Sequence, residues 1–104
     1  MTGHSKGGGE AAIASKLLAA EGYNIKRCVT FGAPRAVMFW SQDRYNDNEF
    51  INYRNGSDLI TTLPFKSFGY RHAGSIKQIG ADFDAAKLSV KRHHFIAQYI
   101  DAMN

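Results

Sequence analysis

The chain has 104 residues with a formal net charge of +4, and 44% of its residues are hydrophobic. This length lies well below the ~200 to 250 residues of the larger single-domain α/β architectures, so residues 1–104 are predicted to form one domain at most. The composition is that of a globular protein and excludes disorder as the default, and no stretch reaches the ~18 consecutive apolar residues of a membrane span.

The first predicted elements are a helix and a strand. Residues 11–22 are rich in Ala and Leu, with apolar positions three and four apart, and Gly22 is expected to cap this helix at its C-terminus. Residues 25–31 are apolar and β-branched and stop shortly before Pro34, where a strand cannot continue its pairing. The strand expected to lead into the N-terminal glycine-rich segment is reduced to residues 1–2.

The second half of the chain is predicted to hold two further extended segments and a helix. Residues 50–54 alternate as a strand, residues 70–79 form another extended stretch, and residues 88–103 show helical spacing with His94 near the helix start. The order helix, strand, strand, strand, helix predicts the second half of an α/β sheet, in which sites form at the carboxyl ends of strands.

The segment Gly3-His4-Ser5-Lys6-Gly7 carries the pattern G-x-S-x-G. This pattern is typical of a nucleophile elbow, a sharp strand-to-helix turn that lifts a serine hydroxyl clear of the sheet. The turn strains the serine backbone and crowds both glycines, so we expect side chains at either position to collide with the strand or the helix. A glycine-rich turn that binds phosphate is the alternative. The order Ser-Lys-Gly differs from the Walker pattern, and no G-x-G-x-x-G is present.

A serine hydroxyl becomes a good nucleophile when a histidine takes its proton and a carboxylate orients that histidine. The order Ser, Asp, His that accompanies this elbow is met by Asp58 and His94. The alternative role of Asp58 is to cap the preceding Asn-Gly turn. Among the other histidines, His4 lies inside the elbow and is expected to be structural. His72 is the main competitor for the base, and on a helix His93 would point ~100° away from His94.

Blocks of residues spread over nearly the whole chain are more specific than the elbow alone. They are Thr2–Gly8, Val29–Arg35, Tyr53–Asp58, Leu63-Pro64, Gly69–Gly74, and His94 with Tyr99 five residues further on. Together these blocks resemble the class 3 lipases, the fungal-lipase-like family of α/β-hydrolases, including its bacterial and phage members.

The resemblance implies a partial α/β-hydrolase fold, the C-terminal half of the sheet with the elbow at its N-terminus. It implies Ser5 as nucleophile, Asp58 as acid and His94 as base. The backbone N–H of Lys6 would donate to the oxyanion, and residues 32–35 would form a structural loop beneath the site. The implied reaction is hydrolysis of an ester or lipid through an acyl-enzyme, without a metal or organic cofactor.

Two features depart from the family. Lys6 stands where these lipases usually carry leucine, which keeps the backbone N–H but makes the entrance more polar. The family's strands before the elbow, its second oxyanion donor and its frequent lid have no counterpart in residues 1–104, so we expect weak or no activity from this chain alone. Another chain that supplies this half, or a homo-oligomer, is the expected partner. An inactive fragment that serves as a binding or structural module is the alternative.

The remaining features point to few other functions. The basic cluster at residues 91–94 could contact an acidic partner, but a basic run beside a helix is typical of a solvated face and no nucleic-acid partner is expected. Cys28 is the single cysteine, so no intramolecular disulfide forms and a buried thiol is expected. Met1 is not followed by the basic and apolar regions of an export signal, so the cytoplasm is the default expectation.

Overall fold

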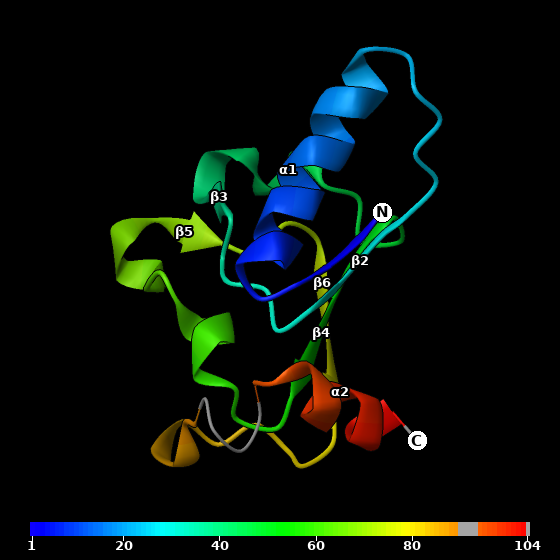
Figure 1. The fold of residues 1–104 in the computed structure, drawn as a ribbon. Helices are drawn as coiled ribbons and strands as arrows, with labels where there is room; N and C mark the ends of the chain where they lie inside the picture. Colours follow the sequence, from blue (N-terminus) through cyan, green and yellow to red (C-terminus); the bar gives the residue numbers. More distant parts are fainter. Residues whose placement is uncertain (90–93, 104) are drawn as a thin grey trace.

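Four short strands pair in parallel, in the order in which they occur along the chain (Figure 1). The computed structural model describes residues 1–89 and 94–103. The sheet consists of β1 (Thr2–His4), β2 (Cys28–Phe31), β4 (Phe50–Asn55) and β6 (Ser75–Ile79). Two further strands, β3 (Val37–Met38) and β5 (Tyr70–Arg71), pair antiparallel beside it. The helices are α1 (Lys6–Ala20) and α2 (Ile96–Met103), and short 3-10 turns are η1 (Phe39–Arg44), η2 (Leu59–Thr62), η3 (Lys66–Phe68) and η4 (Ala85–Lys87). The predicted α/β class is confirmed.

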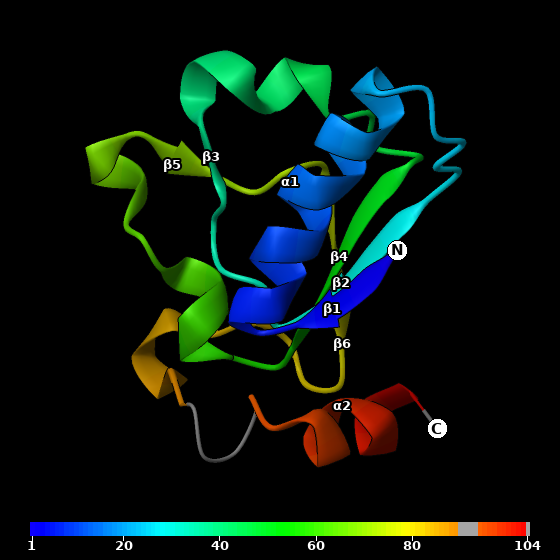
Figure 2. The ribbon, with the colours of Figure 1, turned by 45° about the horizontal axis from the view of Figure 1, so that its top comes forward.

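The alternation of side chains along the strands gives the sheet two different faces. Cys28 and Thr30 of β2 are buried on the face that α1 covers, and they pair in register with Phe50 and Asn52 of β4. Small residues of α1 and the neighbouring apolar side chains form the core on this face, namely Ala11, Ala12, Cys28, Val37, Phe50 and Ala73. Figure 2 shows α1 along the sheet and α2 at the far end of the strands.

Helix α1 begins five residues earlier than predicted, directly after Ser5. Three consecutive glycines have low helix propensity, which is why the pattern of apolar residues alone did not include them. The predicted end is confirmed. Gly22 has φ +95°, its N–H donates to Ala19 C=O, and Tyr23 N–H donates to Leu18 C=O. These are the two bonds of a Schellman motif, in which glycine is favoured at the left-handed position.

The strand that leads into Ser5 was expected to be reduced to residues 1–2, and this expectation is wrong. β1 runs from Thr2 to His4 and pairs with β2, with Gly3 opposite Thr30. The extended stretch predicted over 70–79 is two strands, because Gly74 at φ +95° breaks it. β5 pairs with β3, and β6 pairs with β4.

The C-terminal helix is shorter than predicted. Residues 88–103 were expected to be helical, but Leu88 is irregular, Ser89 forms a parallel bridge with Asp58, and α2 starts at Ile96. His94 therefore precedes the helix rather than lying within it. Among the helices of the described residues, none combines the length and the apolar character needed to cross a membrane.

Candidate active site

Ser5 lies in the sharp turn between β1 and α1. Its backbone has φ 57° and ψ −132°, and among the described residues it is the one non-glycine with a positive φ. Such a conformation is strained and persists only where the surroundings enforce it. Here Ser5 N–H donates to Phe31 C=O at 2.9 Å, which fastens the turn to the neighbouring strand. The serine side chain is thereby placed at the carboxyl end of the parallel sheet.

The glycines around Ser5 are not equivalent. A Cβ atom on Gly3 would lie 2.3 Å from Gly7 O, and one on Gly8 would lie 2.8 Å from the Ala33 Cβ. By contrast, a Cβ placed on Gly7 would meet no atom of the described chain within 4 Å beyond its chain neighbours and the surrounding helix backbone. The expected collision therefore holds for Gly3 and is wrong for Gly7. The close approach of helix to sheet instead requires Gly8.

Asp58 follows β4 and is fully buried. Its Oδ1 accepts from Ile60 N–H at 3.0 Å, so the carboxylate caps the following turn η2 rather than the preceding Asn-Gly turn of the alternative interpretation. Its Oδ2 accepts from two side chains, the Tyr99 hydroxyl at 2.6 Å and His94 Nδ1–H at 2.8 Å. A buried carboxylate needs such donors because its desolvation is otherwise costly. Asp58 thus serves both as a turn cap and as the acceptor for His94.

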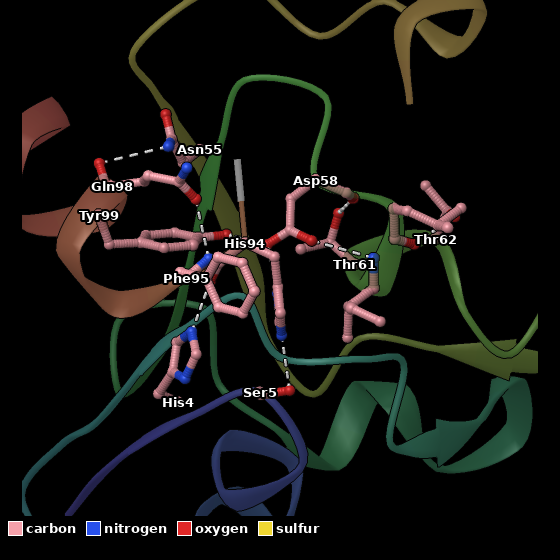
Figure 3. Close-up of polar contacts among 12 residues, drawn as sticks. His4, Ser5, Asn55, Asp58, Thr61, Thr62, His94, Phe95, Gln98 and Tyr99 are labelled. Atoms are coloured by element: carbon pink, nitrogen blue, oxygen red, sulfur yellow. Dashed lines mark hydrogen bonds and ion pairs between the residues drawn. The ribbon is translucent and has the colours of Figure 1, made fainter. Parts of the chain in front are cut away.

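His94 connects Asp58 to Ser5, as Figure 3 shows. Because the carboxylate can only accept, Nδ1 carries the proton, and Nε2 is left as an acceptor 2.7 Å from Ser5 Oγ. An imidazole held in this tautomer can take the proton of a serine hydroxyl while the carboxylate stabilises the cation that forms. The structure therefore brings the three predicted side chains together in one hydrogen-bonded row.

Two residues that close this site were not predicted to contact it. Tyr99 was used as a marker of the family pattern, but its buried hydroxyl donates to Asp58, and burial together with Asp58 raises the pKa of Tyr99 well above its usual 10. Gly32 has φ +65°, and a Cβ there would lie 2.8 Å from Asp58 Oδ2 and 3.0 Å from both His94 Nδ1 and the Tyr99 hydroxyl. Gly32 was expected as part of a loop beneath the site, and it borders the space in which the Asp58, His94 and Tyr99 side chains meet.

The other described histidines, His72 and His4, contact groups other than the Ser5 hydroxyl. His72 is buried, its Nε2–H donates to Thr61 C=O at 2.7 Å, and burial lowers its pKa to about 4. His4 forms no hydrogen bond with Ser5 and instead stacks on the His94 ring, with ring centroids 4.8 Å apart. His93 lies outside the described residues, as does most of the basic cluster at 91–94.

The first residue of α1 presents a backbone donor beside the nucleophile. Lys6 is the first residue of α1, so no carbonyl within the helix can accept from its N–H, while the Lys6 side chain is exposed to solvent and pairs with Glu10 at 3.4 Å. An N–H group at a helix start favours negative charge. In the described part of the chain, no three His, Cys, Asp or Glu side chains gather in a way that could hold a metal ion.

Comparison with known proteins gives a consistent family assignment. The model of the class 3 lipase family matches residues 1–68, a span that includes Ser5 and Asp58 but not His94. A curated relative, the secreted mono- and diacylglycerol lipase 1 of Fusarium solani, is 34% identical over 74 residues, which are 69% of this chain and 22% of that protein. The cytoplasmic expectation gains no support from a relative that is named as secreted.

Two solved lipase structures share the fold. The lipase of Rhizopus microsporus var. chinensis superposes with a TM-score of 0.65 at 23% identity, covering 86% of this chain and 37% of that one. The Rhizomucor miehei lipase, solved with its propeptide, gives a TM-score of 0.60 at 27% identity, covering 83% and 29%. This chain therefore spans between 22% and 37% of the length of these three proteins.

Proposed function

This chain belongs to the class 3 lipase family, and on that premise we propose that it carries the site of a serine carboxylic-ester hydrolase. The observation that supports the proposal is the hydrogen-bonded row Ser5, His94, Asp58, with distances of 2.7 and 2.8 Å. The substrate class that we propose is an ester or a lipid ester. We make the proposal for the site and not for the longer relatives, of which this chain spans a part.

The proposed reaction forms an acyl-enzyme on Ser5. The Ser5 Oγ attacks the ester carbonyl while His94 Nε2 takes its proton, and the Asp58 carboxylate stabilises the resulting imidazolium. Negative charge develops on the carbonyl oxygen, where we assign the Lys6 N–H as a donor. Return of the proton from His94 to the departing alkoxide releases an alcohol. A water molecule then repeats the sequence on the acyl group and releases the acid.

The expected rate depends on how many donors stabilise the oxyanion. Within the described residues we assign one, the Lys6 N–H, and removing a single donor from such a site costs about 3 to 4 kcal/mol. We therefore propose that the isolated chain is slow, and that a second polypeptide or a second copy of this chain that adds a donor would accelerate it. An inactive binding module is the competing possibility.

Labelling with a fluorophosphonate tests the proposal directly. The Ser5 Oγ displaces fluoride from phosphorus, and His94 accepts the hydroxyl proton, so no ester substrate needs to be known. We expect covalent labelling of the purified chain, none for Ser5→Ala, and at least ~1000-fold slower labelling for His94→Ala. Ser67→Ala, an exposed serine on η3, is the matched control and should label like the unaltered chain. A folded chain that takes up no label would instead support the binding module.

A further inference from the structure

His4 makes two contacts with His94, a hydrogen bond and a ring stack, and neither takes part in the proposed proton transfers. Its Nε2 lies 2.6 Å from the backbone carbonyl oxygen of His94, and because a carbonyl only accepts, His4 Nε2 is the donor. Its ring also stacks on the His94 imidazole, with centroids 4.8 Å apart and planes 30° apart. In Figure 3, His4 lies beneath His94 and next to Ser5.

The acceptor of this hydrogen bond lies just outside the helix. The first helical bonds of α2 use the Phe95 carbonyl, which accepts from Gln98 N–H at 2.9 Å and Tyr99 N–H at 3.3 Å. The His94 carbonyl therefore belongs to a turn whose position α2 alone does not determine. The His4 side chain supplies a donor to it from β1, on the other side of the site.

Consecutive residues thus hold the base at its two ends. Ser5 is hydrogen-bonded to the ring at Nε2, and His4 is hydrogen-bonded to the main chain of the same residue. The edge of the Tyr99 ring packs against His4, with centroids 6.0 Å apart at 73°, which limits the rotamers open to His4. Catalytic groups must be held to within about 0.5 Å of their productive geometry, and a short rigid strand achieves this better than a loop.

We propose that His4 is a positioning residue that, through its Nε2–H bond to the His94 carbonyl and its stacked ring, holds His94 at the distance from which Nε2 takes the Ser5 proton. This inference rests on the proposed function of Ser5 and His94. It assigns His4 no contact with the substrate and no proton transfer of its own. In the Gly3-His4-Ser5 sequence, His4 makes the bond to the His94 carbonyl and the ring contact with His94.

Two substitutions separate the hydrogen bond from the ring. His4→Phe keeps an aromatic ring over His94 but has no donor, whereas His4→Gln places an amide N–H near the position of Nε2 without a ring. We expect the limiting rate of fluorophosphonate labelling to fall about tenfold in His4→Phe, with the half-saturating probe concentration unchanged, and to return to within about threefold of the unaltered chain in His4→Gln. A general loss of folding would not be rescued in this way.

Histidine ring 15N spectra give a readout that does not depend on activity. We expect His94 in the unaltered chain and in His4→Gln to show sharp signals with the proton on Nδ1, and in His4→Phe to show signals that are broadened because the ring moves relative to Ser5 and Asp58. If the unaltered chain takes up no label, the proposed function fails and these spectra alone decide the role of His4. His94 signals that are identical in His4→Phe and the unaltered chain would overturn the inference, as would a His4→Gln variant that behaves like His4→Phe.

Discussion

Gly32 sets the space in which the polar groups of the site meet. The missing side chain at this position leaves room for three atoms at once, the Asp58 and Tyr99 oxygens and the His94 nitrogen. Its φ of +65° is also a conformation that costs a residue with an L side chain about 1 to 2 kcal/mol. The two requirements coincide at one residue because β2 ends there, at the edge where the carboxyl ends of β1 and β4 also lie.

Gly32→Ala is expected to disable the site more than it destabilises the fold. A methyl group 2.8 Å from Asp58 Oδ2 would push the carboxylate away from His94, and a displacement of about 1 Å costs roughly 100-fold in rate. We therefore expect fluorophosphonate labelling at least ~100-fold slower than in the unaltered chain. Gly22→Ala is the matched control, because Gly22 also has a positive φ but no neighbour within 4 Å among the described residues. Equal labelling of both variants would contradict this account.

The residues of the site divide into those that the sequence could identify and those that it could not. Ser5 sits in a local motif, and Asp58 and His94 follow it in a known order, so pattern and family resemblance placed all three. Gly32 leaves space beside the carboxylate that Tyr99 bonds, but no local pattern encodes this arrangement, because it depends on how the end of β2 and α2 lie in space.

At the level of elements, the elbow depends on how closely α1 approaches β1. The N-terminal turn of α1 crosses the end of β1 so tightly that Gly3 faces the backbone of Gly7 and Gly8. Small residues form the face of α1 that packs on the sheet, whereas Leu17 is exposed to solvent. Small side chains on the inner face of α1 allow the helix to lie close to the sheet, but each of them buries little apolar area.

The two glycines of the motif should respond in opposite ways to alanine. Gly7→Ala adds a methyl group to an open position in a helix and should raise the free energy of unfolding by about 0.5 to 1 kcal/mol. Gly3→Ala places a methyl group 2.3 Å from a carbonyl oxygen and should lower it by about 1 to 3 kcal/mol or more. Urea unfolding followed by circular dichroism measures both changes. A loss of stability in Gly7→Ala would show that the motif needs glycine there for a reason other than space.

Element boundaries were harder to predict than element types. The helix over 11–22 and the strands near 25–31 and 50–54 are present, because their apolar patterns reflect burial. The segment over 70–79 changes partner at Gly74, and the run from residue 88 is occupied first by a bridge to Asp58. Both departures are tertiary interactions that override a local pattern.

For the whole molecule, His72 ties the folded state to pH. It is buried beneath η2, its Nε2–H is bonded to Thr61, and within the described residues its Nδ1 has no partner. Burial lowers its pKa from 6.5 to about 4, with Arg35, Arg54 and Lys66 acting in the same direction, whereas the bond to Thr61 opposes the shift. The folded chain therefore binds the proton less readily than the unfolded chain does.

Acid should destabilise the fold through this residue. Above pH 6.5 both states are neutral at His72. As the pH falls from 6.5 to about 4 the unfolded state takes the proton first, so stability is lost progressively, by up to about 3 kcal/mol. His72→Gln retains an N–H donor for Thr61 but cannot titrate, and it should show a shallower decline in urea-unfolding free energy over this window. Parallel curves for the two proteins would assign the acid sensitivity to other groups.

The hydrogen bond between Ser5 and His94 spans 89 positions of the chain, and that between His94 and Asp58 spans 36. The segment 94–103 carries both the imidazole and Tyr99, while the sheet holds the serine and the carboxylate. Undocking of this one segment would dismantle the site and leave the four-stranded sheet paired, since such local openings cost less than global unfolding. The labelling rate of Ser5 then reports a population. Divided by the rate for a permanently closed site, it gives the fraction of molecules in which the segment 94–103 is docked and His94 contacts Ser5.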